Sequence, residues 1–448
     1  MKKARAILCG VLAALMLAGC GGQQGGATLD LKQYAVAQAV YPDYPKRPVE
    51  ADYYRDDGQW DDSAYEADYE KYVDGLRALG KNEERVDTAA LTAFSGNTAA
   101  AIFTTQENTV YSPVSLYVAL GMLTELTDGE TKQQVMDLLG AADAGALRQQ
   151  IKKLWVSVYQ DGDAVCRLAN AAFLRENADV KQSAADTLAQ WYYASSYRVP
   201  MGTEEADRAI ASWLNQQTGG LLAEETGNIR TDAANLLRLY NTIYYKAGWW
   251  EPFKSSRTKA DTFTAADGSE QRADFMHLTE TGDVLRGEGY TAAPKSLKCG
   301  RMVFVLPDEG VTPESLLARD GFLTELTGEY SMADVVWSVP RFDVKTSVDL
   351  KDILKALGVT DAFDGNMADF TPLTDNGAMV NSVMQAARVK IDEEGVEAVA
   401  YTEIVANDSS AMIEPPPVVE MNLNRPFLFV IFDGNDVPLF VGTVQTVA

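Results

Sequence analysis

The chain has 448 residues, and its 64 acidic and 39 basic side chains give a formal net charge of −25 at neutral pH. A protein this acidic is poorly suited to bind nucleic acid or an anionic lipid surface, because both carry negative charge. The sequence also contains no P-loop, HExxH, CxxC or GxGxxG motif, so we expect no cofactor and no bound metal.

The first twenty residues have the proportions of a targeting segment. A basic start is followed by an apolar run, Ala6 to Ala18, that is too short for a comfortable membrane span. Leu17–Cys20 resembles the lipobox of bacterial lipoproteins, which implies a signal peptide at 1–19 and lipidation of Cys20. The glycine-rich tether at 21–26 favours this anchored form. We therefore expect an extracytoplasmic protein, lipid-anchored to a bacterial membrane or cell surface. The alternative is an ordinary secretory signal with an incidental cysteine.

Residues 20–85 are predicted to contain the lipidated cysteine, a flexible tether and a stalk rich in tyrosine and acid. Three prolines argue against continuous regular structure in the first half of the stalk. Farther along, Asp62 to Leu79 is predicted to form a short amphipathic helix capped by Asp61 or Ser63. We interpret this region as a solvated stalk that lifts a domain off the membrane. The alternative is that its aromatic side chains bind a ligand.

Residues 86–448 have the composition of a folded domain, and no linker or repeat divides them. Helical patterns fill the first half, at 88–105, 112–126, 130–139, 145–159, 183–191 and 203–218. Strand patterns dominate afterwards, at 236–249, 301–306, 335–344, 386–391, 418–423, 427–433 and 437–447. Helices followed by mostly antiparallel strands indicate an α+β fold. The turn at 433–436 predicts that the last two strands form a buried hairpin.

Few residues in this chain suit catalysis. The single histidine, His277, lies between a methionine and a leucine, and we interpret it as structural. No G-x-S-x-G elbow is present, and neither Cys166 nor Cys299 carries an activating signature. We therefore predict that the protein is not an enzyme. The sequence leaves open whether the two cysteines pair.

The stretch from Ile391 to Pro417 combines a strand pattern with a loop composition. Between Val396 and Ala406 the residues alternate, with only small or apolar uncharged side chains on one face and Glu397 and Glu403 on the other. The residues that follow are rich in Asn, Asp, Ser and Pro, which favour loops. On this pattern alone, an ordinary edge strand followed by a loop is the simplest interpretation.

The string EEGVEAVAYTEIV at 393–405 resembles the hinge of the reactive-centre loop of inhibitory serpins. Further motifs of that family follow in the family's order over about 360 residues. They are NTVYSPVS at 108–115, YNTIYYKAGW at 240–249, PF at 252–253, PRF at 340–342, RPFLF at 425–429 and LFVG at 439–442. The resemblance implies the serpin fold, with about nine helices around three β-sheets and an exposed reactive-centre loop.

The resemblance also implies a function. In inhibitory serpins the exposed loop is recognised by a protease as a substrate. After cleavage the loop enters the main sheet as an extra strand, and the protease is trapped as a covalent acyl-enzyme. We therefore expect a suicide-substrate inhibitor of serine proteases. One alternative is a non-inhibitory serpin that serves as a surface binding or structural protein. Another, from outside the family, is an adhesin or solute-binding lipoprotein that uses the stalk.

The family motifs assign roles to two groups of residues. The hinge would comprise Glu394, Gly395, Val396, Glu397, Ala398, Val399 and Ala400. The shutter and breach, where the main sheet opens, would comprise Asn108, Ser112, Ser115, Asn241, Trp249 and Gln385. Two positions depart from the family. Gln385 stands where the family has histidine, but it can still donate and accept hydrogen bonds. Val396 replaces threonine and is still suited to a strand.

The family register places the scissile bond fourteen residues after the hinge glycine, between Ser409 and Ser410, with Asp408 and Met412 as alternative reactive residues. No Lys or Arg occurs between 390 and 425, so a trypsin-like pocket would have no cation to pair with its buried acid. Small residues suit elastase-like or subtilisin-like proteases. The expected partner is such a serine protease, or a cysteine protease, and we expect the inhibitor to be a monomer.

Overall fold

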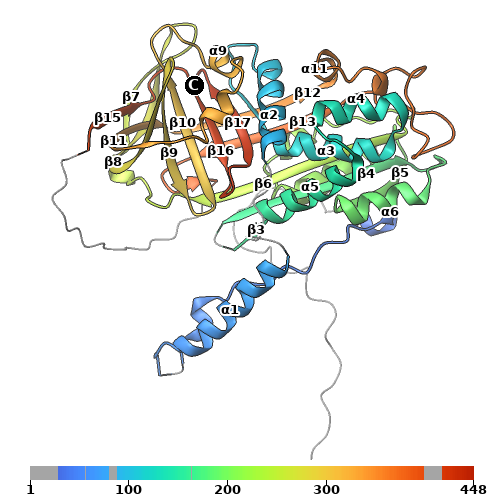
Figure 1. The fold of residues 1–448 in the computed structure, drawn as a ribbon, viewed down its shortest axis with the longest axis horizontal. Helices are drawn as coiled ribbons and strands as arrows, with labels where there is room; N and C mark the ends of the chain where they lie inside the picture. The colour runs from blue at the N-terminus through green and yellow to red at the C-terminus, as the bar shows by residue number, and fades with distance from the viewer. Residues whose placement is uncertain (1–28, 56, 80–87, 163, 398–415, 448) are drawn as a thin grey trace, which may run out of the picture.

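The computed structural model of the chain describes residues 29–55, 57–79, 88–162, 164–397 and 416–447. Two strand networks and the helices packed on them make up the body (Figure 1). The helices are α1 (Asp62–Ala78), α2 (Ala89–Ile102), α3 (Pro113–Leu126), α4 (Gly129–Leu139), α5 (Ala144–Val158), α6 (Gln182–Trp191), α7 (Glu204–Gln217), α8 (Ala223–Thr226), α9 (Pro313–Leu317), α10 (Phe322–Glu325) and α11 (Lys351–Ala356).

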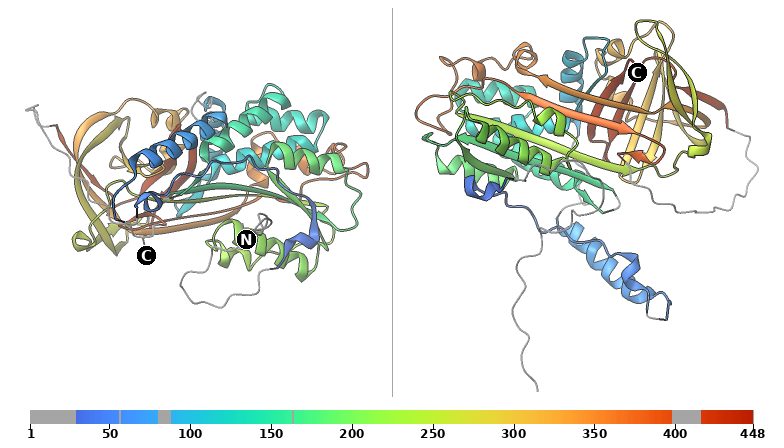
Figure 2. Two further views of the ribbon diagram at one scale, coloured as in Figure 1. Left: turned by 90° about the horizontal axis from the view of Figure 1, so that it is seen from below. Right: turned by 180° about the vertical axis from the view of Figure 1, so that it is seen from behind.

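The first network, which we call the main sheet, has the strand order β1-β5-β4-β6-β14-β13-β12, with β3 paired to β4. Its strands are β1 (Ala35–Ala37), β3 (Gln160–Asp161), β4 (Val165–Arg175), β5 (Ala194–Val199), β6 (Leu237–Gly248), β12 (Phe342–Asp349), β13 (Met384–Ile391) and β14 (Gly395–Val396). Helices α3, α5 and α6 cover one face of this sheet (Figure 1), and α7 lies on the other (Figure 2).

The second network has the order β15-β11-β8-β9-β10-β16-β17-β2, with β7 paired to β8. Its strands are β2 (Thr109–Tyr111), β7 (Lys259–Thr264), β8 (Glu270–Gly287), β9 (Tyr290–Leu297), β10 (Gly300–Pro307), β11 (Ser331–Pro340), β15 (Val418–Asn422), β16 (Phe427–Phe432) and β17 (Pro438–Val444). The long strand β8 pairs with β7 and β11 over most of its length and with β9 only at its end. It therefore joins two sheets, which makes three with the main sheet.

Helix α3 shows how the sequence builds the layer beneath the main sheet. The Ser112 hydroxyl accepts a hydrogen bond from the Ser115 N–H (3.3 Å), and Pro113 occupies the first turn, where no intrahelical N–H bond is lost. All of its residues except Ala119 are buried. A helix that is buried on nearly every side must lie inside the core. This helix therefore holds the shutter serines at the underside of β6 and β13.

The N-terminal region differs in part from the predicted stalk. Strand β1 pairs with β5, and the Tyr44 ring stacks on Tyr159 with their centroids 3.7 Å apart. The ring centroids of Tyr41 and Trp155 also lie 6.0 Å apart. Residues 31–44 therefore belong to the folded body. Helix α1 does project away from it (Figure 1), and Asp61 caps α1 as predicted.

The remaining N-terminal predictions are not tested by the fold. The signal peptide, Cys20 and the boundary at residue 86 lie outside the described residues. Within the described ranges, no helix has an apolar stretch long enough to cross a bilayer.

Candidate functional site

The hinge already lies partly inside the main sheet. After β13 the chain turns at 392–394 and returns as β14, whose two residues lie between β13 and β6. Val396 pairs with both Ala247 and Ile391, and its side chain is buried. A Cβ atom at Gly395 would overlap the carbonyl oxygen of Ala247, so this close approach requires glycine.

A network of polar contacts fixes the turn before β14. The Glu393 carboxylate is buried and accepts two hydrogen bonds from Arg341 (2.6 and 3.0 Å) and one from the Thr258 hydroxyl. Burial acts to raise the pKa of Glu393, but the bonds from Arg341 and Thr258 outweigh it, and the net pKa is lowered. The Trp249 indole N–H donates to the Asp392 carbonyl (2.9 Å). The turn is therefore held by residues just after β6, just before β7 and between β11 and β12.

A buried lysine packs against two aromatic residues near the turn before β14. Lys295 is 1% exposed, its ammonium donates to Glu280 (3.0 and 3.3 Å), and it lies 4.8 Å from the centre of the Phe253 ring and 5.8 Å from that of Trp249. The Trp337 indole donates to the same carboxylate (2.8 Å). Burial lowers the pKa of Lys295, although Glu280 opposes the shift.

The structure brings together four of the six predicted shutter and breach residues. Gln385 exchanges two hydrogen bonds with the backbone of Ser112 (3.0 and 3.1 Å), the Ser115 hydroxyl donates to Asn241, and the Asn241 amide donates to Asn170. These bonds link α3 to β13, β6 and β4. The other two have different partners: Trp249 contacts the turn before β14, and Asn108 forms hydrogen bonds with Gln445 and Thr446 near the C-terminus.

Beyond β14, the space between β6 and β13 contains two cavities, which we call the opening. The larger cavity has a volume of about 80 Å³. It is lined by α3, by residues 236–241 around the start of β6, and by residues 382–385 around the start of β13. The smaller, about 20 Å³, lies nearer β14 and touches Ile243 and Ala387. In the described residues, β6 pairs along one edge with β4 but on the other only with β14. Among the described residues, the rest of that edge has no strand partner.

Glu397 follows β14 and has an unusual environment. Its backbone φ is +49°, which is uncommon for a residue with a Cβ atom. Its N–H donates to the Lys390 carbonyl (3.0 Å), and its Oε2 is buried with no hydrogen-bond partner. Burial raises its pKa to about 7.

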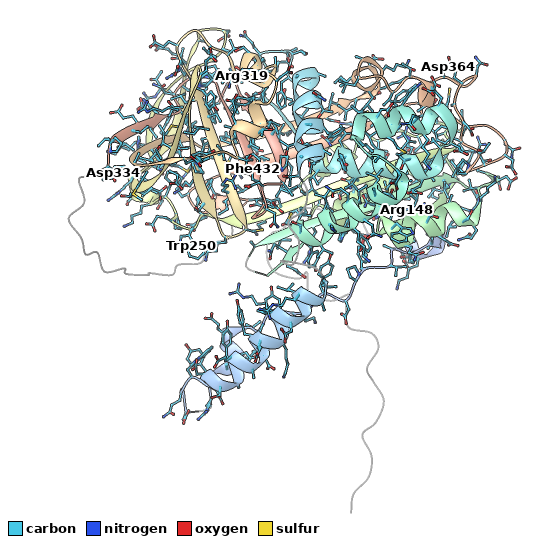
Figure 3. The ribbon with its side chains drawn as sticks, viewed as in Figure 1. Arg148, Trp250, Arg319, Asp334, Asp364 and Phe432 are labelled. Carbon is cyan, nitrogen blue, oxygen red and sulfur yellow. The ribbon has the colours of Figure 1, made fainter. Side chains whose placement is uncertain are left out.

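The rest of the predicted loop cannot be placed. Ala398, Val399 and Ala400, the reactive bond at Ser409 and Ser410, and the alternatives Asp408 and Met412 all lie outside the described residues. The described chain ends at Glu397, directly after the pair formed by Val396 and Ala247. It is described again from Pro416, and the Asp334 N–H donates to the Pro417 carbonyl (2.9 Å). Figure 3 labels Asp334, and also Trp250, which lies just after the end of β6 in the sequence.

Comparison with known proteins gives the family. Residues 89–447 match the family model described as Serpin (serine protease inhibitor). The chain belongs to the serpin family. Serpin-Z1A of Triticum aestivum is 30% identical over 358 residues, covering 75% of this chain and 89% of that protein. Serpin B6 of Macaca fascicularis is 28% identical over 344 residues, covering 72% and 89%. Serpins generally inhibit proteases rather than catalyse reactions, although some are not inhibitors.

Solved serpin structures share the fold. The thermophilic serpin tengpin in its native state matches with a TM-score of 0.72 at 24% identity, covering 82% of this chain and 95% of that one. The structure described as thyroxine-binding globulin complex with thyroxine matches at 0.70 and 23%, covering 81% and 99%. The predicted α+β serpin fold is confirmed.

Sequence reasoning missed several residues of this serpin's hinge region. Arg341 lies in the PRF motif at 340–342, but nothing in the sequence indicates that it pairs with Glu393, and no sequence motif contains Thr258, Lys295 or Glu280. Asn170 was missed as well. It is an amide within an otherwise apolar run, at the middle of β4, and it is 1% exposed. A buried polar residue needs a partner, and that was the available signal.

Proposed function

We propose that this serpin inhibits serine proteases by inserting its hinge and the following loop into the opening of the main sheet, and that the protease is trapped as a covalent acyl-enzyme. The observation that carries the proposal is β14 itself, which is the first part of such a strand. It pairs with both neighbours, and the cavities continue along the same line. Completing this strand would supply backbone hydrogen bonds to two strand edges, which favours insertion.

The pairing of β14 fixes the register of the longer strand. Val396 is opposite Ala247, and partner numbers fall by one for each residue in an antiparallel pair. Since β6 begins at Leu237, the strand that would fill its whole length runs from Gly395 to Ala406. This is the same segment whose side chains alternate in the sequence.

The side chains suit the positions that this register assigns to them. On the face shared with Val396, Ala400 would lie between Ile243 and Ala387, beside the smaller cavity. Thr402 would lie between Asn241 and Gln385, so its hydroxyl would meet the polar shutter residues. No charged side chain would enter this face, and burying an unpaired charge there would be costly.

We further propose that the target is an elastase-like or subtilisin-like protease. The support is the sequence of the loop, which has small residues around Ser409 and Ser410 and no Lys or Arg between 390 and 425. We also propose that the mature protein is a monomer that begins at a lipidated Cys20 and lies outside the cytoplasm, on a bacterial membrane or cell surface. This rests on the lipobox-like Leu17–Cys20.

The test is a denaturing gel of the purified protein with elastase-like, subtilisin-like, chymotrypsin-like and trypsin-like enzymes, combined with the mass of the released C-terminal peptide. We expect a covalent complex with one of the first two enzymes and a peptide that starts at Ser410. A peptide that starts at Ile413 would move the reactive residue to Met412. The matched control is the same protease with its nucleophilic serine changed to alanine, which cannot form the complex. Cleavage without any complex would instead indicate a non-inhibitory serpin.

A further inference from the structure

Glu397 lies where the chain leaves the main sheet, in a position that does not suit an ionised carboxylate. Its left-handed backbone is disfavoured for a residue with a side chain, and only Tyr193 and Asp436 share a positive φ among the described non-glycine residues. Its Oε2 is buried and makes no hydrogen bond. Such a group loses its hydration without receiving a partner, and this costs much more for an ion than for a neutral acid.

Charged and titratable groups face Glu397 from three strands. Lys246 and Tyr244 come from β6, Arg388 and Lys390 from β13, and Asp343 from β12. Arg388 already forms a two-bonded pair with Asp343 (2.6 and 2.8 Å). Neither Lys246 nor Lys390 forms an ion pair with Glu397 in the described part of the chain. Burial therefore outweighs the three cations, and the pKa of Glu397 rises from 4.5 to about 7.

Full insertion would change this environment. In the register set by β14, Glu397 becomes an ordinary extended residue directly opposite Lys246 on one side and Lys390 on the other. Side chains directly opposite on neighbouring strands lie on the same face and interact. Both alternatives to the present hinge, expulsion into water and full insertion between two lysines, suit the ionised carboxylate better than its present position.

We propose that Glu397 is a proton-controlled positioning residue of the hinge. In its protonated form it holds β14 in the partly inserted position described above, and its ionisation releases the hinge from that position. The part of this proposal that concerns full insertion rests on the proposed inhibitory function, whereas the release of β14 in the uncleaved protein does not.

The pH dependence of the equilibrium between the inserted and the released hinge follows from the difference in the pKa of Glu397 between these two states. A group whose pKa is raised in one state binds its proton more tightly there, so the partly inserted hinge is favoured at low pH and loses this advantage as the pH rises through about 7. Between pH 5.5 and pH 8, an ideal two-state linkage would change the ratio of inserted to released hinge by about 25-fold. Because the side chain is only partly buried, we expect about tenfold.

Hydrogen exchange of the intact protein tests the hinge without any protease. The readout is the protection of the peptide 392–397, divided by the intrinsic exchange rate at each pH. We expect protection to fall about tenfold from pH 5.5 to pH 8 in the wild type and to stay level in Glu397→Gln. Glu397→Asp retains a carboxyl group and should restore the pH dependence. Glu403→Gln, which removes another acid of the same segment, should keep the wild-type profile.

Two results would overturn the proposal: a level profile in the wild type, or a wild-type profile in Glu397→Gln. If Glu397→Gln fails to fold, the comparison between the wild type and Glu397→Asp still decides, since a level profile in both would also overturn it. Protease assays over the same pH range separate the two proposals. Covalent complex with no difference between wild type and Glu397→Gln would count against the role of Glu397 alone. A pH-dependent hinge with no complex at any pH would count against inhibition alone.

Discussion

Replacing Ala400 by arginine tests the register and the insertion mechanism together. In the register of β14, residue 400 enters between Ile243 and Ala387, where the cavity is only about 20 Å³. An arginine there would be too large and would bury a charge among apolar side chains. Leaving a buried charge unpaired costs about 3–5 kcal/mol. If that cost is present in the transition state of insertion, the rate falls by about two to four orders of magnitude.

The assay for Ala400→Arg is the number of inhibitor molecules consumed per protease inhibited, with covalent complex measured on a denaturing gel. We expect a variant that folds and is cleaved, but that releases active protease because deacylation outruns insertion. The control is Glu403→Arg, which places the same charge on the opposite face of the strand, beside the exposed Met384, and should still trap the protease. Undiminished complex from Ala400→Arg would refute the reasoning.

Two further predictions follow from the structure, and a third follows from the lipobox-like sequence at Leu17–Cys20. The loop-cleaved protein should melt above the intact protein by about 10 °C or more, because a new central strand is worth several kcal/mol; equal melting temperatures would favour a non-inhibitory serpin. Arg341→Ala should lower the free energy of unfolding by about 2 kcal/mol, because it leaves the buried Glu393 carboxylate without its main partner. The pKa of Glu393 is lowered by folding, so this loss should be present at neutral pH and shrink as the pH falls below 4.5; a loss independent of pH in chemical denaturation would contradict it. Cys20→Ser should move the protein from the membrane fraction to the soluble fraction of the producing cells, and an unchanged distribution would argue against the lipid anchor.

Local rules were sufficient for many elements of the fold. The cap at Ser112 and Pro113 predicts the start of α3, and the turn at 433–436 predicts the antiparallel pair β16 and β17. Both signals depend on residues that are close in the sequence. Strands β4 and β5 lie among helices and are buried on nearly all sides, so neither shows the period-2 alternation that predicts a strand. In β4 the central run is almost entirely apolar, whereas β5 contains two serines and an arginine, which hide its burial in the sequence.

Four residues of the candidate site could be named from the sequence, but their partners and the geometry could not. Ser112, Ser115, Asn241 and Gln385 were expected together, and the structure brings them together. The partial insertion of β14 could not be predicted, because it depends on whether two distant strands leave space between them. The packing of Tyr41 and Tyr44 on the body was missed for a related reason: prolines and acidic residues nearby indicate a loop, whereas the contacts are made with residues more than a hundred positions away.

The short strand β1 also determines how the main sheet meets other molecules. If the sheet accepts a strand at its centre, as proposed above, its outer edge is a competing site, because an open edge invites pairing between chains. Strand β1 covers β5 with only three residues, and its register shifts between Ala35 and Ala37. A strand this short and irregular is a poor template for a neighbouring chain. The N-terminal segment thus makes this edge of the sheet a poor pairing site for a second chain, so that in the proposed mechanism the centre of the sheet is the place where a strand can add.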